Sequence, residues 1–315
     1  IMPSLVGSEM CIRDRYMKVI CIGHIAYDLT FPVSRVPEEN TKIRTTHHVE
    51  CGGGPMRNAA LPLAFWHSNV ELCGMIGNDY QGEQIINELK HLGIGTKYIV
   101  KRNDITTDQA VILAATNGTR TIVTSVKPKE HPLIKISENF DGILIDGEEY
   151  QTSQQVLKNN KTALSIIDAG KYNSEVISLA HKVKVVACSK EFAEKFSQEK
   201  IDPSNMEQLK NIHLKLENEF KNIVIITLEE YGSLTKIGNE YKLIPSMKVN
   251  TVDSSGAGDI FHGALLYFML MNYSLEDSIK LSNICGALAT TRLGNKDFNF
   301  SLTKILKYGG VNDII

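Results

Sequence analysis

The chain has 315 residues, of which 43% are hydrophobic and 22% are charged. These values are typical of a folded globular protein, and they exclude disordered, collagen-like and disulfide-stapled chains. With 34 basic and 36 acidic residues, the formal net charge is −2. A dedicated nucleic-acid-binding or membrane-surface protein is therefore not expected, because such proteins carry a basic excess. No apolar run approaches the ~20 residues needed to cross a bilayer.

Residues 1–16 do not read like the rest of the chain. They lack the charged start and apolar stretch of a secretory signal, and the letters SLVGSEMCIRDR resemble a translated sequencing adapter. A regular apolar strand begins directly after Met17. We therefore expect residues 1–16 to be a non-native extension, although a genuine extension is the alternative, and residues 17–315 to form a single domain.

From residue 18 onward, short runs rich in valine and isoleucine alternate with helical patterns. Apolar runs without polar alternation predict buried parallel strands, and their alternation with helices predicts right-handed crossovers in a doubly wound α/β sandwich with a mostly parallel sheet. The predicted strands are Val19–Ile22, Gly142–Ile145, Ser165–Ile167, Val183–Ala187 and Ile223–Thr227; the predicted helices are Met56–His67, Gly82–Leu92, Ser174–His181, Glu191–Phe196, Met206–Phe220, Ala257–Met271 and Leu275–Arg292.

Two stretches, residues 31–49 and 110–127, break this pattern. They hold short alternating segments at 42–45, 110–113 and 121–124, and the turn signal Asn117-Gly118 separates the last two. These segments predict a small antiparallel β lid attached to the main sheet. Because an exposed strand edge can pair with another chain, a homodimer through the lid is expected.

Six cysteines stand at positions 11, 21, 51, 73, 188 and 285, and no two form a CxxC pair. Such scattered cysteines predict reduced thiols and a cytoplasmic location. His47 and His48 lie near Cys51, but no HxxxH or CxxC spacing supports a metal site there. No directly ligated metal is expected.

The first glycine-rich loop is Cys51-Gly-Gly-Gly-Pro-Met-Arg-Asn58. Its three glycines let the backbone approach a ligand closely, and the side chain of Asn58 both donates and accepts hydrogen bonds. This combination is suited to sugar hydroxyls. A tight turn that needs positive φ is the alternative, and it would explain one or two of the glycines.

The second loop, Asn250–Ala264, places small residues before a strongly apolar helix. The free amides of Gly256, Ala257 and Gly258 at the helix N-terminus predict an anion site. A bound phosphate would repel Asp259 beside them, so Asp259 is predicted to be a general base, with the amides stabilising a transferring phosphoryl group. The alternative is that Asp259 only satisfies the helix dipole and that Asp253 or Ser254 only caps the helix. The sequence has no P-loop, no protein-kinase motif set and no dinucleotide fingerprint.

Three segments together resemble the ribokinase-like (PfkB) carbohydrate kinases. Gly53–Asn58 is similar to the family's first signature, and Asp253-Ser-Ser-Gly-Ala-Gly-Asp259 is similar to the second, with Ser254 where the family usually has threonine. Gly23–Asp28 matches the opening strand and its sugar-binding aspartate. The likeness covers residues 17 to about 300 in the family's order.

Two branches of the family are especially similar. Asn117–Ile122 and Ser189–Ala193 resemble the ketohexokinase branch, whereas Gly52–Pro55 and Phe261–Ala264 resemble the sulfofructose-kinase branch. The resemblance implies transfer of the γ-phosphate of ATP to a hydroxyl of a ketose-type sugar. It implies that Mg²⁺ binds together with ATP and that a monovalent cation can be a further cofactor. No membrane partner is expected.

The resemblance also assigns roles to individual residues. Asp259 would be the base, and Gly256, Ala257 and Gly258 would form the anion hole. The substrate-binding residues would be Asp28, Gly53, Gly54, Asn58 and, from the lid, Arg120; the nucleotide-binding residues would be Ser189, Thr227, Gly232, Asp253, Ser254 and Asn283.

Arg57 is a special case. A cation in the first turn of a helix opposes the helix dipole, so solvent, a structural partner or an acidic group on the substrate must offset it. The last alternative makes Arg57 a further substrate-binding residue, because a guanidinium matches sulfonate or phosphate oxygens well.

The chain also departs from the family pattern. Ser189-Lys-Glu-Phe192 stands where many members have Asn-x-x-Glu, so the metal-organising glutamate is missing or shifted to Glu191. Glu229 replaces a glycine within Thr227–Gly232. A nucleoside kinase of the same fold and a catalytically silent sugar-binding protein are the alternatives; a lid with few aromatic residues disfavours the first, and retention of Asp259 disfavours the second.

Overall fold

The computed structural model describes residues 17–116, 118–125 and 130–312. The expectations for residues 1–16, for Asn117 and for the end of the lid segment at 126–127 lie outside the described residues. The described elements are, in chain order, β1 (Lys18–Ile22), β2 (Ala26–Val33), β3 (Val49–Gly53), α1 (Pro55–Phe65), β4 (Asn69–Gly77), α2 (Tyr80–His91), β5 (Gly95–Arg102), β6 (Gln109–Ala115), β7 (Arg120–Thr124), β8 (Gly142–Ile145), α3 (Tyr150–Asn159), β9 (Leu164–Ala169), α4 (Ser174–Ala180), β10 (Val185–Ser189), α5 (Lys190–Ser197), α6 (Met206–Phe220), β11 (Ile223–Thr227), the short 3₁₀ helix η1 (Glu229–Tyr231), β12 (Ser233–Ile237), β13 (Glu240–Ile244), α7 (Ala257–Leu270), α8 (Leu275–Ala289) and α9 (Leu302–Gly309).

The large sheet has nine strands in the order β13-β12-β11-β10-β9-β8-β1-β4-β5. Neighbours from β11 to β5 run parallel, and β12 and β13 join antiparallel at one edge. In β1, Val19 and Cys21 pack into the core on one face, while Ile20 and Ile22 pack into the core on the other. Both faces are therefore covered, which explains why the strand reads as an uninterrupted apolar run.

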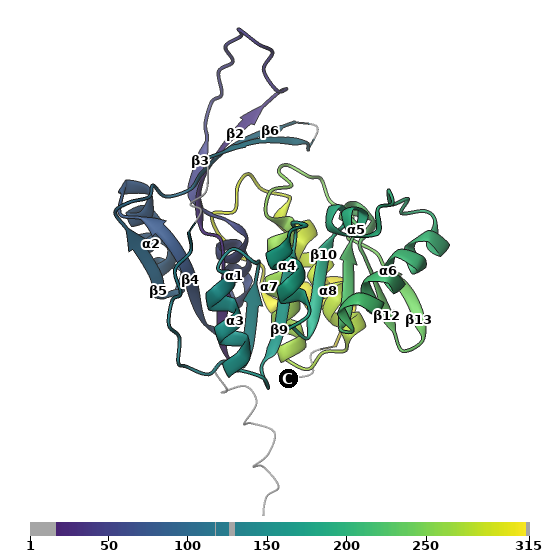
Figure 1. The fold of residues 1–315 in the computed structure, drawn as a ribbon. Helices are drawn as coiled ribbons and strands as arrows, with labels where there is room; N and C mark the ends of the chain where they lie inside the picture. Colours follow the sequence, from purple (N-terminus) through teal and green to yellow (C-terminus); the bar gives the residue numbers. More distant parts are fainter. Residues whose placement is uncertain (1–16, 117, 126–129, 313–315) are drawn as a thin grey trace, which may run out of the picture.

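Helices cover both faces of this sheet. Helices α1, α2, α7, α8 and α9 contribute to one core cluster, and α3, α4, α5 and α6 contribute to the other. Figure 1 shows α3 to α6 in front of the sheet and the yellow-green α7 and α8 behind it. The predicted doubly wound α/β sandwich is confirmed.

The predicted strands of the large sheet and the predicted helices are all present, with ends displaced by a few residues at most. The prediction missed β4, β5, β12 and β13 in the sheet and the helices α3 and α9. In β4, Glu71 and Gly74 interrupt the apolar run. The strand β5 lies at the sheet edge, and its short apolar run is flanked by Lys97, Lys101 and Arg102. These strands carry weaker apolar signals than the central five.

A second sheet of four strands, in the order β3-β2-β6-β7, forms the lid. The pairs β2–β3 and β6–β7 are antiparallel, whereas β2–β6 is parallel. The strand expected at 42–45 is wrong, because residues 34–48 hold no strand; the lid is built instead from β2, which begins at Ala26, and from β3. Figure 1 shows the small sheet at one end of the large sheet, with the purple 34–48 segment projecting beyond it.

The five described cysteines, Cys21, Cys51, Cys73, Cys188 and Cys285, are buried and form no disulfide. Within the described part of the chain, no helix has both the length and the apolarity to cross a bilayer.

Candidate active site

Helices α1 and α7 carry the two signature loops, and they pack unusually close together. A Cβ atom added at Gly263 on α7 would overlap the backbone carbonyl of Ala59 on α1, so only glycine permits this approach. The close packing places the first turns of both helices side by side. Asn58 Nδ2 therefore donates a hydrogen bond to Asp259 Oδ2 at 2.9 Å, and the structure brings the two predicted loops into one site.

The N-terminus of α7 has the geometry of an anion site. Gly256 caps the helix in the left-handed conformation at φ 70°, and the first helical bond runs from the Ile260 amide to the Gly256 carbonyl at 3.0 Å. The amides of the preceding residues have no partner within the helix ladder. Gly258 is exposed, and a Cβ added there would meet nothing within 4 Å. A negatively charged group can therefore reach these amides from the open side.

Asp259 sits in an environment that favours its protonated form. Burial and the negative charge of Asp168 raise the pKa of the Asp259 carboxyl to about 6. The hydrogen bond from Asn58 and the charges of His262 and Arg120 act in the opposite direction. A carboxylate with a pKa near neutrality is suited to accept a proton at physiological pH.

Asp28 lies on β2 and packs directly against the first loop. A Cβ added at Gly53 would overlap the Asp28 carboxyl group, which explains a glycine at that position. Gly54 follows as the N-cap of α1, with φ 88°. Burial raises the pKa of Asp28 to about 7, against the lowering effect of Arg57 and with Asp259 as a further raising charge. The structure thus places a second carboxyl group beside Asn58 and Asp259.

Arg57 does not point toward a substrate. Its side chain is fully buried, and its guanidinium donates to Glu88 on α2 and to the backbone carbonyls of Asn295 and Lys296. It also donates to Asn58 Oδ1 at 3.1 Å. The interpretation of Arg57 as a substrate ligand is therefore replaced by the alternative of a structural partner, because no free face of the guanidinium reaches an open site.

Arg120 and Asp253 tie the second loop to its surroundings. Arg120, the first residue of β7 in the lid, donates from Nη1 to Ser254 Oγ at 3.1 Å. Asp253 is buried and accepts from the amides of Ser255 at 2.9 Å and Gly294 at 3.0 Å. The lid thus contacts the signature loop, and the buried Asp253 carboxylate holds this loop against the Gly294 backbone.

Ser189 and Thr227 end two adjacent strands, β10 and β11, and are register partners. The Ser189 hydroxyl accepts from the Phe192 amide at 3.1 Å and caps α5, and the Thr227 hydroxyl donates to the Cys188 carbonyl at 3.3 Å. Glu191, in the first turn of α5, accepts from Lys195 at 2.6 Å. The exposed Glu191 carboxylate is therefore paired with a lysine one turn later on the same helix.

Gly232 and Asn283 lie where β12 and β13 meet α8. Asn283 is buried; it accepts from Ser233 Oγ at 2.7 Å and donates to the Ile244 carbonyl at 2.9 Å. A Cβ at Gly232 would overlap the same carbonyl. The interpretation of Asn283 as a direct nucleotide ligand is therefore corrected, because its amide is already bonded to the protein and holds this wall of the site in place.

Two buried residues close to Asp259 were not predicted from the sequence. Asp168 is the penultimate residue of β9. Its Oδ2 lies 3.1 Å from Nδ1 of His262, which follows Asp259 by one turn on α7. Burial disfavours the charged imidazole, but the charge of Asp168 prevails and raises the pKa of His262. Two signals were available: a polar residue at the carboxyl end of a predicted parallel strand, and an i, i+3 spacing on a predicted helix.

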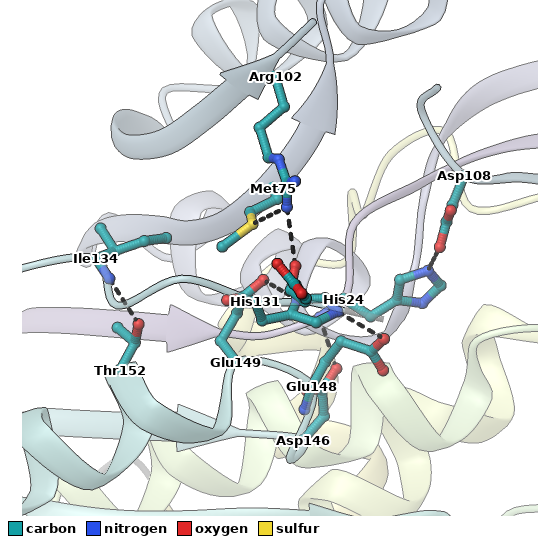
Figure 2. Close-up of polar contacts among 11 residues, drawn as sticks. His24, Met75, Arg102, Asp108, His131, Ile134, Asp146, Glu148, Glu149 and Thr152 are labelled. Atoms are coloured by element: carbon teal, nitrogen blue, oxygen red, sulfur yellow. Dashed lines mark hydrogen bonds and ion pairs between the residues drawn. The ribbon is translucent and has the colours of Figure 1, made fainter. Parts of the chain in front are cut away.

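Figure 2 shows a second polar cluster near the carboxyl ends of β1 and β8. His24 Nε2 lies 2.9 Å from Asp108 Oδ2, just before β6, and the His24 amide donates to Asp146 at 2.8 Å. His131 Nδ1 lies 3.0 Å from Glu149 Oε1. Burial raises the pKa of Asp146 to about 6. These contacts fix the segment between β1 and β2 against both sheets.

No group of three or more histidine, cysteine or acidic side chains is placed to hold a metal ion among residues 17–116, 118–125 and 130–312. The amides at the start of α7 and the open space at Gly258 instead offer a cradle for phosphate groups. Such a cradle fits a metal that arrives already bound to a nucleotide.

Comparisons with known proteins agree with this geometry. The family model described as pfkB family carbohydrate kinase matches residues 17–299. The chain is 27% identical to a ribokinase of Lactococcus lactis over 297 residues, covering 88% of this chain and 92% of the relative, and 24% identical to a fructokinase of Vibrio alginolyticus over 307 residues, covering 88% and 96%. The crystal structure of a putative ribokinase from Agrobacterium tumefaciens superposes with a TM-score of 0.84 at 20% identity, covering 93% of this chain and 97% of that one. The chain therefore belongs to the pfkB family of carbohydrate kinases, which are ATP-dependent phosphotransferases.

Proposed function

We propose that this kinase transfers the γ-phosphate of ATP to a hydroxyl group of a ketose-type sugar or sugar derivative. One observation carries this proposal: Asp259, whose carboxylate is held by Asn58 at 2.9 Å, lies in the first turn after the free amides of α7. A proton acceptor next to an anion cradle is what phosphoryl transfer to a hydroxyl requires.

The proposed acceptor site lies between β2 and α1. Asp28 and Asn58 bind hydroxyl groups of the sugar, and Gly53 and Gly54 let the ring approach the backbone. Asp259 takes the proton of the reacting hydroxyl as its oxygen attacks the γ-phosphorus of ATP. The new P–O bond forms as the bond to ADP breaks. The amides of Gly256–Gly258 stabilise the charge on the transferring group.

The nucleotide would lie over the ends of β10 and β11, between Ser189, Thr227 and Gly232. Ser254 and Asp253 would shape the phosphate end of this site, and Arg120 would reach it from the lid. Mg²⁺, when bound with ATP, would neutralise charge that develops during transfer. A monovalent cation is a further proposed cofactor, which a comparison of activity in K⁺ and in tetramethylammonium buffers would test.

The ketose preference rests on the two branch resemblances and on the fructokinase among the relatives. It is tested with a panel of ketoses, aldoses and nucleosides, measured by ADP release with ATP in excess. The proposal expects the highest kcat/KM for a ketose. A higher kcat/KM for ribose or for a nucleoside would overturn the ketose assignment, and no turnover on any acceptor would favour a silent sugar-binding protein.

The lid supports a further proposal, that the chain forms a homodimer. All five residues of β7 are exposed, and Val123 on this strand is 65% exposed. Pairing of two lids would cover this apolar surface. Light scattering at micromolar concentration should give twice the monomer mass, and Val123→Lys should return the protein to a monomer. We further propose that residues 17–315 form one kinase domain. We also propose that it acts in the cytoplasm, because buried free thiols are typical of proteins in a reducing compartment.

A further inference from the structure

Arg57 combines three features that need a common explanation. Its side chain is fully buried, it lies in the first turn of α1, and its guanidinium is bonded to Glu88 and to the carbonyls of Asn295 and Lys296. A cation in this turn opposes the helix dipole. A buried ion pair is also weak evidence for stability, because well-packed apolar residues often serve as well. Stability alone therefore does not explain the arginine.

The contact between Arg57 and Asn58 fixes the orientation of the Asn58 amide. A guanidinium has only donors, so the atom of Asn58 that faces Arg57 Nη1 at 3.1 Å must be the oxygen. The NH₂ end is then turned toward Asp259 Oδ2 at 2.9 Å. A flipped amide would set two donors against each other on one side and two oxygens against each other on the other. Arg57 thus decides which end of Asn58 meets the carboxylate.

The orientation matters because of the charges around Asp259. Asp168 on β9 and Asp28 on β2 disfavour a third negative charge, whereas His262 on α7 and Arg120 on β7 favour it. The hydrogen bond from Asn58 adds to the favourable side and lowers the pKa of the Asp259 carboxyl. It also restrains the rotation of the carboxylate, since one of its oxygens is bonded.

Arg57 reaches the anion loop as well. The carbonyl of Asn295 accepts from its guanidinium, and the side-chain amide of Asn295 donates to the Ser255 carbonyl at 2.8 Å. A Cβ at Gly256 would overlap this same Asn295 amide. One buried arginine therefore holds both the partner of Asp259 and the residue that packs under the α7 N-terminus.

We propose that Arg57 is a positioning residue for phosphoryl transfer: its guanidinium orients the Asn58 amide toward Asp259 and fixes Asn295 against the anion loop. This inference rests on the proposed role of Asp259 as the base.

The test uses substitutions that do not leave a buried charge alone. Arg57→Met combined with Glu88→Gln removes both charges, and the glutamine keeps an acceptor for the Gly52 amide, which Glu88 Oε2 binds at 2.9 Å. Arg57→Lys keeps the charge but loses the planar fork of donors. The matched control is Lys236→Met with Glu217→Gln, a 2.9 Å ion pair between β12 and α6.

The proposal expects kcat of the Arg57→Met/Glu88→Gln and Arg57→Lys variants to fall by roughly 10- to 100-fold. It also expects the acid limb of kcat/KM to move up by about half a pH unit or more, because the carboxylate has lost its oriented donor. KM for ATP should stay within about twofold, and the control pair should change neither kcat nor the acid limb.

An acid limb that stays in place in every folded variant overturns the inference. So does a control pair that loses as much kcat as the Arg57 variants when both have lost the same melting temperature. Asp259→Asn separates the two levels of the argument. If that variant keeps full turnover, the proposed base is wrong; if it is inactive while the Arg57 variants behave as the control, only the role of Arg57 is wrong.

Discussion

The two sides of the α7 N-terminus use polar side chains differently. On the proposed acceptor side, Asn58 donates to Asp259, and the carboxyl groups of Asp28 and Asp259 both have raised pKa values. On the proposed nucleotide side, Ser189 is bonded to the Phe192 amide, and Asn283 is bonded to the Ser233 hydroxyl and the Ile244 carbonyl. We propose that side chains of the acceptor side take part in the chemistry, whereas those of the nucleotide side hold the backbone in place.

This difference teaches where substitutions should affect turnover and where they should affect stability. A side chain that stabilises a transition state can be replaced without unfolding the protein, but catalysis suffers. A side chain that satisfies buried backbone groups leaves them unpaired when it is removed, and the folded state suffers. Measurements on each side test this contrast.

The largest effect is expected for Asp259→Asn. The amide cannot accept the proton of the reacting hydroxyl, so kcat should fall by roughly 10²–10⁴, the usual contribution of a positioned general base. The melting temperature should change little, because the substitution preserves shape and removes an unfavourable buried charge. A variant that keeps more than about a tenth of wild-type turnover would contradict the role of Asp259.

A smaller effect is expected for Asp28→Asn. Loss of a charged acceptor for sugar hydroxyls, worth about 1.5–3 kcal/mol, should raise KM for the sugar roughly 10- to 100-fold. KM for ATP should not change, since Asp28 lies on the acceptor side. Equal increases in both KM values would show that the two sides are not separate.

The pH dependence follows from the two raised pKa values. The Asp259 carboxyl, with a pKa of about 6, gains a proton as the pH falls through 6, so kcat/KM should drop about tenfold per pH unit below that value. Asp28, with a pKa of about 7, should add a second limb near neutrality. The profile of Asp28→Asn should lose the limb near 7 and keep the one near 6; a profile that is flat from pH 5 to 8 would contradict both assignments.

Arg120→Ala should have the smallest kinetic effect. Its hydrogen bond to Ser254 links the lid to the signature loop at 3.1 Å, and loss of about 0.5–1.5 kcal/mol corresponds to a roughly two- to tenfold lower kcat/KM. The melting temperature should stay close to that of the wild type. Arg35→Ala is the matched control, because Arg35 is an exposed arginine paired only loosely with Glu38 at 3.8 Å; an equal kinetic loss there would deny Arg120 a specific role.

Much of this contrast could be predicted from the sequence. The central strands are buried on both faces, so their apolar runs are unbroken, and the glycines before Asn58 and Asp259 mark helix starts with unusual backbone. Edge strands such as β5, with one face near solvent, gave weaker signals. The strand expected at 42–45 failed because local alternation does not show whether a partner strand is available.

The site was harder to predict where its geometry depends on distant pairing. Asp168 and His262 are 94 positions apart in the chain and meet at 3.1 Å only because α7 packs over β9. Arg57 was recognised as unusual, but its partner Glu88 lies on the next helix, and no spacing in the sequence marks that contact. An arginine in a helix's first turn indicated that Arg57 needs a partner, but only the fold shows that the partner is Glu88.

The most direct measurement compares two asparagines, one on each side, under the same substitution. Asn58→Ala removes the donor to Asp259, and we predict a loss of kcat of at least about tenfold. Asn283→Ala leaves the Ser233 hydroxyl and the Ile244 carbonyl without this partner, and we predict a melting temperature lower by on the order of 5 °C with kcat within about threefold of wild type. Unchanged kcat in Asn58→Ala, or an equal loss of kcat in both variants, would contradict the division of the site into a chemical side and a structural side.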